Sequence, residues 1–223
     1  MEKTAKEKYW SRFPDTYDKN QEYVVGKDFL DEIKRKLNKL PELGKTVELA
    51  CGTGVFTQSI ISKTTHLVAT DLSDELLEIA SKRLVNNSNV MIQKENCMAT
   101  SFASGEFDCV FMANLIHVVE KPAQVLQECH RILKKGGMLI VVSYTNTGMH
   151  LLEKIKLGIR FLKVWGKPPR HIHSISPEKL AALMKNAGFV IEEAKLLGNR
   201  TKAVFVTGKK AGDYVGGGGD AQR

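Results

Sequence analysis

A predicted strand that runs directly into a glycine turn and a helix is the feature that most constrains the fold of this chain. Residues 47–56 read Val-Glu-Leu-Ala-Cys-Gly-Thr-Gly-Val-Phe, and the helix is predicted to begin near Val55. Gly52 and Gly54 lack a Cβ atom, so the turn can adopt positive φ and let a ligand lie against bare backbone, facing helix N-terminal amides. A dinucleotide fingerprint would place a third glycine at Thr57. Its absence argues against a pyrophosphate-containing ligand.

Two carboxylates flank this turn in the sequence. Glu48 lies four positions before Gly52, where it can face a cationic group such as the ammonium of an amino acid. Asp71 ends the next predicted strand, where a carboxylate can accept hydrogen bonds from both hydroxyls of a ribose. Together the two acids favour a nucleoside that carries an amino-acid arm in place of a diphosphate.

At these residues the chain resembles the class I S-adenosylmethionine-dependent methyltransferases. The first motif of that family reads acid-x-Gly-x-Gly-x-Gly, and its second motif is the acid after the next strand. Ala50 stands at the first glycine position, where a methyl group is expected to fit if φ is negative. The resemblance implies S-adenosylmethionine as cofactor, bound by Glu48, Ala50, Cys51, Gly52, Thr53, Gly54, Asp71, Leu72, Asn96, Cys97 and Asn114. The alternative is a structural turn without a cofactor.

Two of these positions, Asn96 and Cys97, follow the third predicted strand, and the first of them departs from the family pattern. The family places there an acid that bonds the adenine amine, followed by a small residue whose amide bonds the ring. This chain has Asn96 and Cys97 at those positions. The carbonyl oxygen of Asn96 can still accept a hydrogen bond from an amine, so the contact is predicted to survive without charge.

Strands and helices alternate along most of the chain. Continuous apolar strands separated by helices predict a doubly wound, Rossmann-like parallel sheet. The segment Leu-Lys-Lys-Gly-Gly, which ends the helix begun at Pro122, resembles the family's Leu-Lys-Pro-Gly-Gly turn, with Gly136 as the helix terminator. A hairpin around Gly198 makes the last strand antiparallel. The predicted α/β sheet has seven strands, at residues 46–49, 66–70, 90–93, 109–112, 138–143, 189–196 and 202–207.

The length of 223 residues fits one domain with a sizeable core. Residues 1–209 are predicted to form a single methyltransferase domain, with residues 1–40 as an N-terminal helical cap and residues 147–174 as a lid-like insertion. The glycine-rich segment 210–223 cannot bury enough apolar surface to order itself, and is predicted to be a flexible tail. The resemblance covers about residues 44–209 and is closest to the type 11 group, which includes quinone and other small-molecule methyltransferases.

Candidate acceptor-binding residues come from the aromatic N-terminal arm, the fifth strand and the segment after the lid. They are Tyr9, Trp10, Tyr17, Tyr144, Arg170 and His173. Ligands of open α/β sheets lie beyond the carboxyl ends of the strands, so Asn114 and His117 are expected to face the cavity. His117 is a candidate general base. The alternative is that it shapes the entry to the next helix.

Residues 151–170 form the least generic segment. Leu151, Leu152, Ile155, Ile159, Leu162 and Trp165 make one helical stripe, beside six basic residues and one acidic residue, for a net charge of +5. Such a segment suits a lid over a hydrophobic acceptor or a helix that touches an anionic membrane surface. A helix packed on the core and a dimer contact are the alternatives.

The composition of the chain restricts the possible classes of function but does not identify one. The formal net charge of +8 attracts anions such as nucleic acid, acidic lipid or anionic small molecules. Cysteines at positions 51, 97, 109 and 129 have neither metal-site nor disulfide spacing, so no metal is predicted. No apolar run approaches the ~20 residues of a membrane span, which predicts a soluble cytoplasmic protein. Monomer and homodimer both remain open.

The predicted function is methyl transfer by in-line displacement from S-adenosylmethionine to a small, hydrophobic or partly anionic acceptor. A tRNA or nucleic-acid methyltransferase is the alternative that the basic charge favours. It is opposed by residues 113–116, which read Ala-Asn-Leu-Ile where enzymes that methylate base amines carry Asn/Asp-Pro-Pro-aromatic. A non-catalytic cofactor-binding module is the other alternative, because Ala50 and Asn96 depart from the family pattern.

Overall fold

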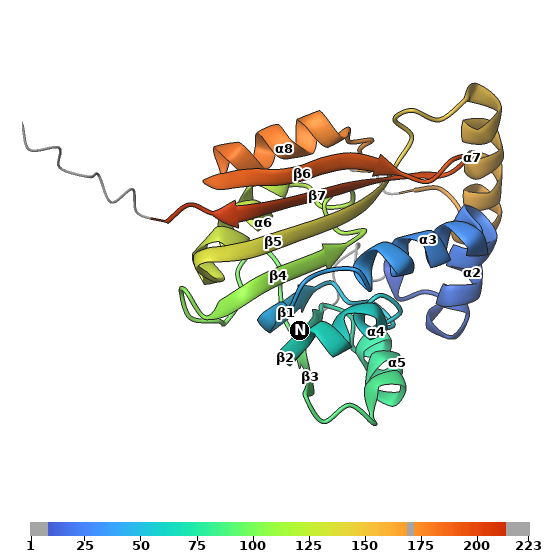
Figure 1. The fold of residues 1–223 in the computed structure, drawn as a ribbon. Coiled ribbons are helices and arrows are strands. Elements are labelled where there is room, and N and C mark those ends of the chain that lie inside the picture. Colours follow the sequence, from blue (N-terminus) through green and yellow to red (C-terminus); the bar gives the residue numbers. More distant parts are fainter. Residues whose placement is uncertain (1–8, 169–171, 213–223) are drawn as a thin grey trace, which may run out of the picture.

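A seven-stranded sheet forms the centre of the computed structural model, which describes residues 9–168 and 172–212 (Figure 1). The strand order is β3-β2-β1-β4-β5-β7-β6, and the first five of these strands run parallel. β7 lies between β5 and β6 and is antiparallel to both. The strands are β1 (Gly44–Leu49), β2 (Thr64–Asp71), β3 (Val90–Lys94), β4 (Phe107–Ala113), β5 (Leu133–Thr145), β6 (Phe189–Leu197) and β7 (Lys202–Lys210). The predicted fold class is confirmed.

Helices cover both faces of the sheet because its central strands are apolar on both sides. Val47, Val110 and Val141 pack in the cluster that includes α6 and α8, whereas Phe111 and Ile140 pack with α2, α3 and α4. The helices are α2 (Tyr17–Val25), α3 (Lys27–Leu37), α4 (Thr57–Ile60), α5 (Asp74–Leu84), α6 (Pro122–Ile132), α7 (Leu151–Trp165) and α8 (Pro177–Asn186), with short 3-10 turns at Pro14–Thr16 and Ile61–Lys63. This two-sided burial accounts for the near-continuous apolar strands.

The sequence gives the helix starts more reliably than the helix ends. Ser73 and Ser176 cap α5 and α8, and each hydroxyl oxygen accepts a backbone N–H bond of 3.2 Å. The helix predicted from Val55 is wrong in extent, because α4 is a single turn that continues as a 3-10 turn. The predicted end of α6 at residues 134–137 is also wrong. Leu133 pairs with Phe107 and is fully buried, so strand pairing ends the helix early.

The order of the strands indicates where in the fold a ligand-binding crevice lies. β1 and β4 are neighbours although β2, β3 and their helices lie between them in sequence, so the chain leaves the two strands in opposite directions along the sheet. Such a switch point leaves a crevice beyond the carboxyl ends of the strands. Within residues 9–168 and 172–212, no helix is long and apolar enough to cross a lipid bilayer. Residues 213–223 of the predicted tail lie outside the described residues.

Candidate functional site

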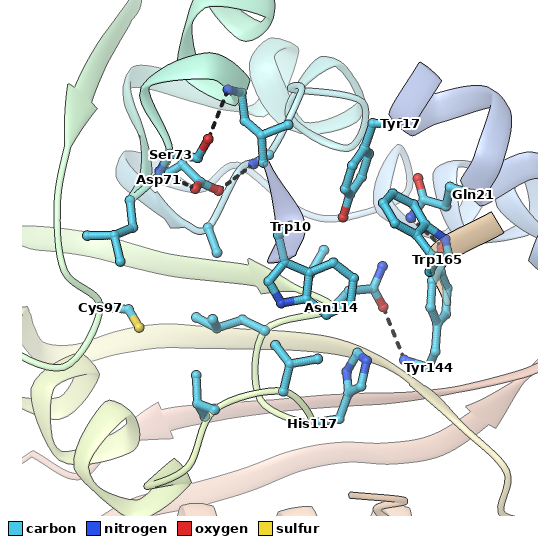
Figure 2. Close-up of a pocket in the computed structure, with 18 of the residues that line it drawn as sticks. Trp10, Tyr17, Gln21, Asp71, Ser73, Cys97, Asn114, His117, Tyr144 and Trp165 are labelled. Atoms are coloured by element: carbon cyan, nitrogen blue, oxygen red, sulfur yellow. Dashed lines mark hydrogen bonds between the residues drawn. The ribbon is translucent and has the colours of Figure 1, made fainter. Parts of the chain in front are cut away.

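A cavity opens at the carboxyl ends of β1, β2 and β4 (Figure 2). It encloses about 1340 Å³ of empty space, part of which is open to solvent. One part of its lining comes from the strand ends and includes Ala50, Gly52, Asp71, Leu72, Asn96, Cys97 and Asn114. The other part includes Trp10, Tyr17, Gln21, His117, Tyr144, Phe161 and Trp165.

The carboxylate of Asp71 organises the first part. Its Oδ2 atom accepts a hydrogen bond of 2.9 Å from the Gly52 N–H, and its Oδ1 atom accepts one of 2.9 Å from the Ser73 N–H. One side chain therefore joins the glycine turn to the start of α5.

The glycine turn is more strained than the sequence indicates. φ is +57° at Gly52 and +79° at Gly54, as expected for a turn of this kind, but it is also +59° at Ala50. The condition under which a methyl group was expected to fit there, a negative φ, is therefore not met. The left-handed conformation costs a non-glycine residue roughly 1–2 kcal/mol because Cβ approaches the following carbonyl. Ala50 therefore adopts at a cost the geometry that the family's glycine adopts freely.

Replacing Ala50 with glycine is expected to raise the free energy of unfolding by up to about 1 kcal/mol, since relief of the left-handed strain exceeds the entropy cost of glycine. Urea unfolding would measure the change. The exposed α8 residue Ala182 supplies the control, because Ala182→Gly should lower the stability by about 1 kcal/mol. A loss of stability in both variants would contradict the assignment of strain to Ala50.

Glu48 is buried beside this turn and does not line the cavity. Its side chain is 1% exposed, and its Oε2 atom has no hydrogen-bond partner among the described residues. The pKa of this carboxyl is raised to about 8, mainly by burial; the Thr57 hydroxyl lowers the pKa and the Asp71 charge raises it. Glu48 is therefore largely protonated at neutral pH. Its predicted contact with a ligand ammonium requires both ionisation and a path to the cavity.

The raised pKa of Glu48 predicts a pH-dependent stability. From the ordinary value of 4.5 up to about 8, the native state holds a proton that the unfolded state has released, so stability falls as pH rises. The buried His117 has the opposite effect, because its lowered pKa favours higher pH, but this effect ends near 6.5. Between pH 6.5 and 8 the wild type should lose about 2 kcal/mol relative to Glu48→Gln.

Urea unfolding at several pH values would measure this difference. Glu22, an exposed residue of α2, supplies the control. Glu22→Gln should follow the wild-type curve because it removes a carboxyl from the exposed surface of α2 and not from the interior. Parallel curves for wild type and Glu48→Gln would show that Glu48 is ionised throughout.

Asn96 and Asn114 use their carbonyl oxygens to shape the loops that carry them. Asn96 Oδ1 accepts a bond of 3.1 Å from the Met98 N–H, and Asn114 Oδ1 accepts one of 3.1 Å from the Tyr144 N–H. Asn114 also has a φ of +57°, which asparagine tolerates better than most residues. Asn96 therefore lines the cavity with its predicted acceptor oxygen already engaged once.

Neutral polar groups face the second part of the cavity. Gln21 donates to the Tyr144 hydroxyl at 2.8 Å, and Nδ1 of His117 lies 2.9 Å from the Ser143 hydroxyl oxygen. Burial lowers the pKa of His117 to about 4 and raises the pKa of Tyr144 well above its usual value. His117 is an uncharged imidazole and Tyr144 an uncharged phenol across the physiological pH range.

An aromatic wall, defined as Trp10, Tyr17, Tyr144, Phe161 and Trp165, closes this second part. The Trp165 ring lies 5.8 Å from that of Trp10 and 5.0 Å from that of Tyr17 between ring centroids. The N-terminal arm and α7 thus meet over the ends of the central strands. The sequence analysis did not assign Gln21 to the site, and it placed Phe161 and Trp165 there only as part of the lid-like segment. The single stripe predicted to join Trp165 to Leu151 and Leu152 is wrong, because Trp165 is buried whereas both leucines are exposed. The i, i+4 spacing of Gln21 from Tyr17 and of Trp165 from Phe161 is the signal that was available.

Several predicted site residues do not line the cavity. They are Tyr9, Glu48, Cys51, Thr53, Gly54 and His173. Tyr9 packs edge-on against Trp10, and the exposed His173 donates its backbone N–H to the His117 carbonyl at 2.9 Å. Arg170 lies outside the described residues. Within residues 9–168 and 172–212, no cluster of His, Cys, Asp or Glu could hold a metal ion.

Thr53 instead attaches the N-terminal arm to the glycine turn. Its hydroxyl donates to Asp18 Oδ1 at 2.5 Å, and Arg83 donates to the Thr53 carbonyl at 2.7 Å while pairing with Asp18. The Ser11 hydroxyl bonds Ser73 at 2.8 Å, so the arm is also joined to the start of α5. These contacts hold the arm across the cavity.

Comparison with known proteins identifies the domain. A family model described as a methyltransferase domain matches residues 47–141. A ubiquinone/menaquinone biosynthesis C-methyltransferase of Geotalea uraniireducens is 33% identical over 55% of this chain and 54% of its own length. A ubiquinone biosynthesis O-methyltransferase of Aromatoleum aromaticum is 28% identical over 69% of this chain and 66% of its own length. The chain therefore spans less than two thirds of the length of either relative.

A solved structure gives the same assignment over more of the chain. The S-adenosylmethionine-dependent methyltransferase of Thermotoga maritima, described as a possible histamine N-methyltransferase, has a TM-score of 0.65 and 26% identity, covering 91% of this chain and 99% of its own. By their names, these three proteins methylate carbon, oxygen and nitrogen. Residues 47–141 therefore match the methyltransferase domain family, and the fold of the chain is that of S-adenosylmethionine-dependent methyltransferases.

Proposed function

We propose that this protein transfers the methyl group of S-adenosylmethionine to a small, neutral and largely apolar acceptor. The observation that carries the proposal is the division of one cavity into a polar part at the strand ends and an aromatic wall. The first part offers a carboxylate and bare backbone, whereas the second offers aromatic rings and uncharged polar atoms. A cofactor and an apolar acceptor would then meet inside one enclosure.

The residues at the strand ends fit the cofactor. Asp71 would receive the ribose hydroxyls, Gly52 would lie against the cofactor without a Cβ to obstruct it, and Leu72, Asn96 and Cys97 would surround the adenine. Glu48 would support the turn from below and would ionise if a cationic arm approaches, since opposite charge favours the charged form. S-adenosylmethionine supplies an activated methyl group on a sulfonium, so the chain needs no metal to activate it.

The lining favours a neutral acceptor over an anionic one. Among the described residues that line the cavity, the charged side chains are Asp71 and Glu95, and both are acidic. An anionic acceptor would be repelled there, and Arg170, the residue predicted to bind one, lies outside the described residues. The aromatic wall suits a flat or branched apolar body, and the Tyr144 hydroxyl suits one polar atom on it.

The chain's own residues would perform two tasks. The aromatic wall and the arm exclude water and hold the acceptor in line with the methyl group, which removes much of the entropic barrier. When bound, S-adenosylmethionine would supply the methyl group to a lone pair of the acceptor, and its sulfur would keep the electrons of the broken carbon–sulfur bond. The acceptor's proton is taken by the neutral His117, through Nε2, because Nδ1 is engaged with Ser143.

Replacing His117 with asparagine is expected to lower kcat on the order of 10²-fold while leaving the affinity for S-adenosylhomocysteine unchanged. The wild-type rate should stay level from pH 9 down to about 5, because the pKa of His117 is lowered to about 4. The exposed His173 provides the control, since His173→Asn should keep full activity. If His117 only shapes the helix entry, His117→Asn would instead lower thermal stability and keep kcat.

A radiolabelled methyl assay across quinol, thiol, amine and tRNA acceptors tests the proposal as a whole. Methylation of a neutral quinol, phenol or thiol is expected. Methylation of tRNA alone would replace the proposal with the nucleic-acid alternative that the net charge of +8 favours, and tRNA binding would then weaken steeply with salt. Calorimetry that shows no binding of S-adenosylhomocysteine would point to a non-catalytic module.

A further inference from the structure

Helix α7 carries a second apolar face that points away from the protein. We define the outer stripe as Leu151, Leu152, Ile155, Ile159 and Leu162, whose spacing puts them on one side of the helix. Each of these side chains is 50% to 71% exposed. Phe161 and Trp165 lie on the opposite side and face the cavity. Figure 1 shows α7 at the outer edge of the molecule beside α2. The exposed fractions of the five side chains show that the outer stripe faces solvent.

Single exposed apolar residues are ordinary, but a contiguous row of five on one helix is typical of an interaction surface. The other large apolar residues that are more than half exposed, Val85 and Val190, lie on separate elements. The outer stripe is therefore the main apolar surface that the described residues leave uncovered.

Basic residues border the outer stripe. Lys154, Lys156, Arg160, Lys163 and Lys167 are exposed, and Glu153 is the single acidic residue of residues 151–168, so the net charge of these described residues is +4. Apolar side chains on one face with lysine and arginine beside them are the pattern of a helix that lies in the interface of an anionic bilayer. Two copies of α7 facing each other would bring like charges together, which disfavours a symmetric dimer through this face.

We propose that α7 docks through its outer stripe on the surface of a lipid bilayer that contains anionic lipids. Leu151, Ile155 and Ile159 would enter the acyl boundary while Lys156 and Arg160 contact lipid phosphates. Because the inner side of the same helix forms part of the aromatic wall, docking would bring the cavity to the layer where apolar molecules accumulate. The source of the acceptor rests on the proposed function, whereas the docking itself does not.

Vesicle sedimentation tests the docking with the full chain and without cofactor or acceptor. Binding is expected to vesicles of equimolar phosphatidylcholine and phosphatidylglycerol, and to weaken at least tenfold with phosphatidylcholine alone or at high salt. Ile155→Gln/Ile159→Gln and Lys156→Glu/Arg160→Glu should each lose at least tenfold in the bound fraction. Matched controls are Val85→Gln for the apolar change and Lys179→Glu/Lys185→Glu on α8 for the charge reversal, and both should bind as the wild type does.

Equal losses in the control variants, or no binding by the wild type, would overturn the proposal. So would light scattering that shows a wild-type dimer converted to a monomer by Ile155→Gln/Ile159→Gln, because the stripe would then be a protein interface. Circular dichroism and binding of S-adenosylhomocysteine confirm that each variant is folded. A protein that binds vesicles but methylates no acceptor would refute the proposed function and leave the docking intact.

Discussion

Replacing Asp71 with alanine is expected to lower the affinity for S-adenosylhomocysteine by about 10³-fold, the largest effect on binding that we predict. The change removes the acceptor of two backbone N–H bonds of 2.9 Å, from Gly52 and Ser73, together with the group proposed to hold the ribose. Hydrogen bonds to a charged group contribute about 1.5–3 kcal/mol each, so loss of the pair and the ligand contact accounts for this magnitude. Isothermal titration calorimetry would measure it.

Asp74 supplies the control for this experiment. It lies in the first turn of α5 and pairs with Lys94 at 2.6 Å on the surface. Asp74→Ala should leave the affinity within about twofold, because an exposed ion pair contributes little. If Asp71→Ala binds as tightly as Asp74→Ala does, the cofactor does not lie along the ends of β1 and β2.

Replacing Trp165 with alanine is expected to lower the free energy of unfolding by about 3–5 kcal/mol, as for other large-to-small changes of buried aromatic residues. Trp165 is 4% exposed and contacts the rings of Trp10, Phe13 and Tyr17, so it connects α7 to the N-terminal arm. Thermal and urea unfolding would measure the loss. Because the acceptor's wall loses its central ring, kcat/KM for the acceptor should fall more than the affinity for the cofactor.

Leu152 on the same helix is 70% exposed and gives the matched control. Leu152→Ala should change stability by less than about 0.5 kcal/mol. An equally small effect of Trp165→Ala would mean that the arm and α7 do not form one packed unit. A large loss of stability with unchanged acceptor kinetics would instead separate the packing of Trp165 from acceptor binding.

The sequence predicts the sheet well because its signals are local and redundant. Apolar runs define β1, β2, β4 and β5, and helix caps such as Ser73 and Ser176 separate the elements. The end of α6 is an exception, because the pairing of Leu133 with Phe107 is a long-range contact that no local pattern encodes. Residues 134–137 have a sequence typical of a helix end, but α6 already ends at Ile132 and β5 begins at Leu133.

Some residues of the candidate site could likewise be predicted from local sequence patterns, whereas others could not. Asp71, Gly52 and Asn114 could be predicted because a motif ties them to strand ends, and all three line the cavity. Glu48 belongs to the same motif but is buried, since strand alternation directs its side chain into the protein. For α7, the spacing of the apolar residues does not distinguish the inner side of the helix, which carries Phe161, from the outer stripe. That distinction depends on packing against the arm.

The origin of the aromatic wall has a consequence for how such enzymes diversify. Trp10, Tyr17, Tyr144, Phe161 and Trp165 all lie outside residues 47–141, the segment shared with the family, whereas Gly52, Asp71 and Asn114 lie inside it. Under the proposed function, exchange of the arm and α7 between relatives would replace four of the five wall residues while Gly52, Asp71 and Asn114 stay in place. The arm and α7 can also change in evolution independently of the core. A shared core then predicts the methyl donor but not the methyl acceptor.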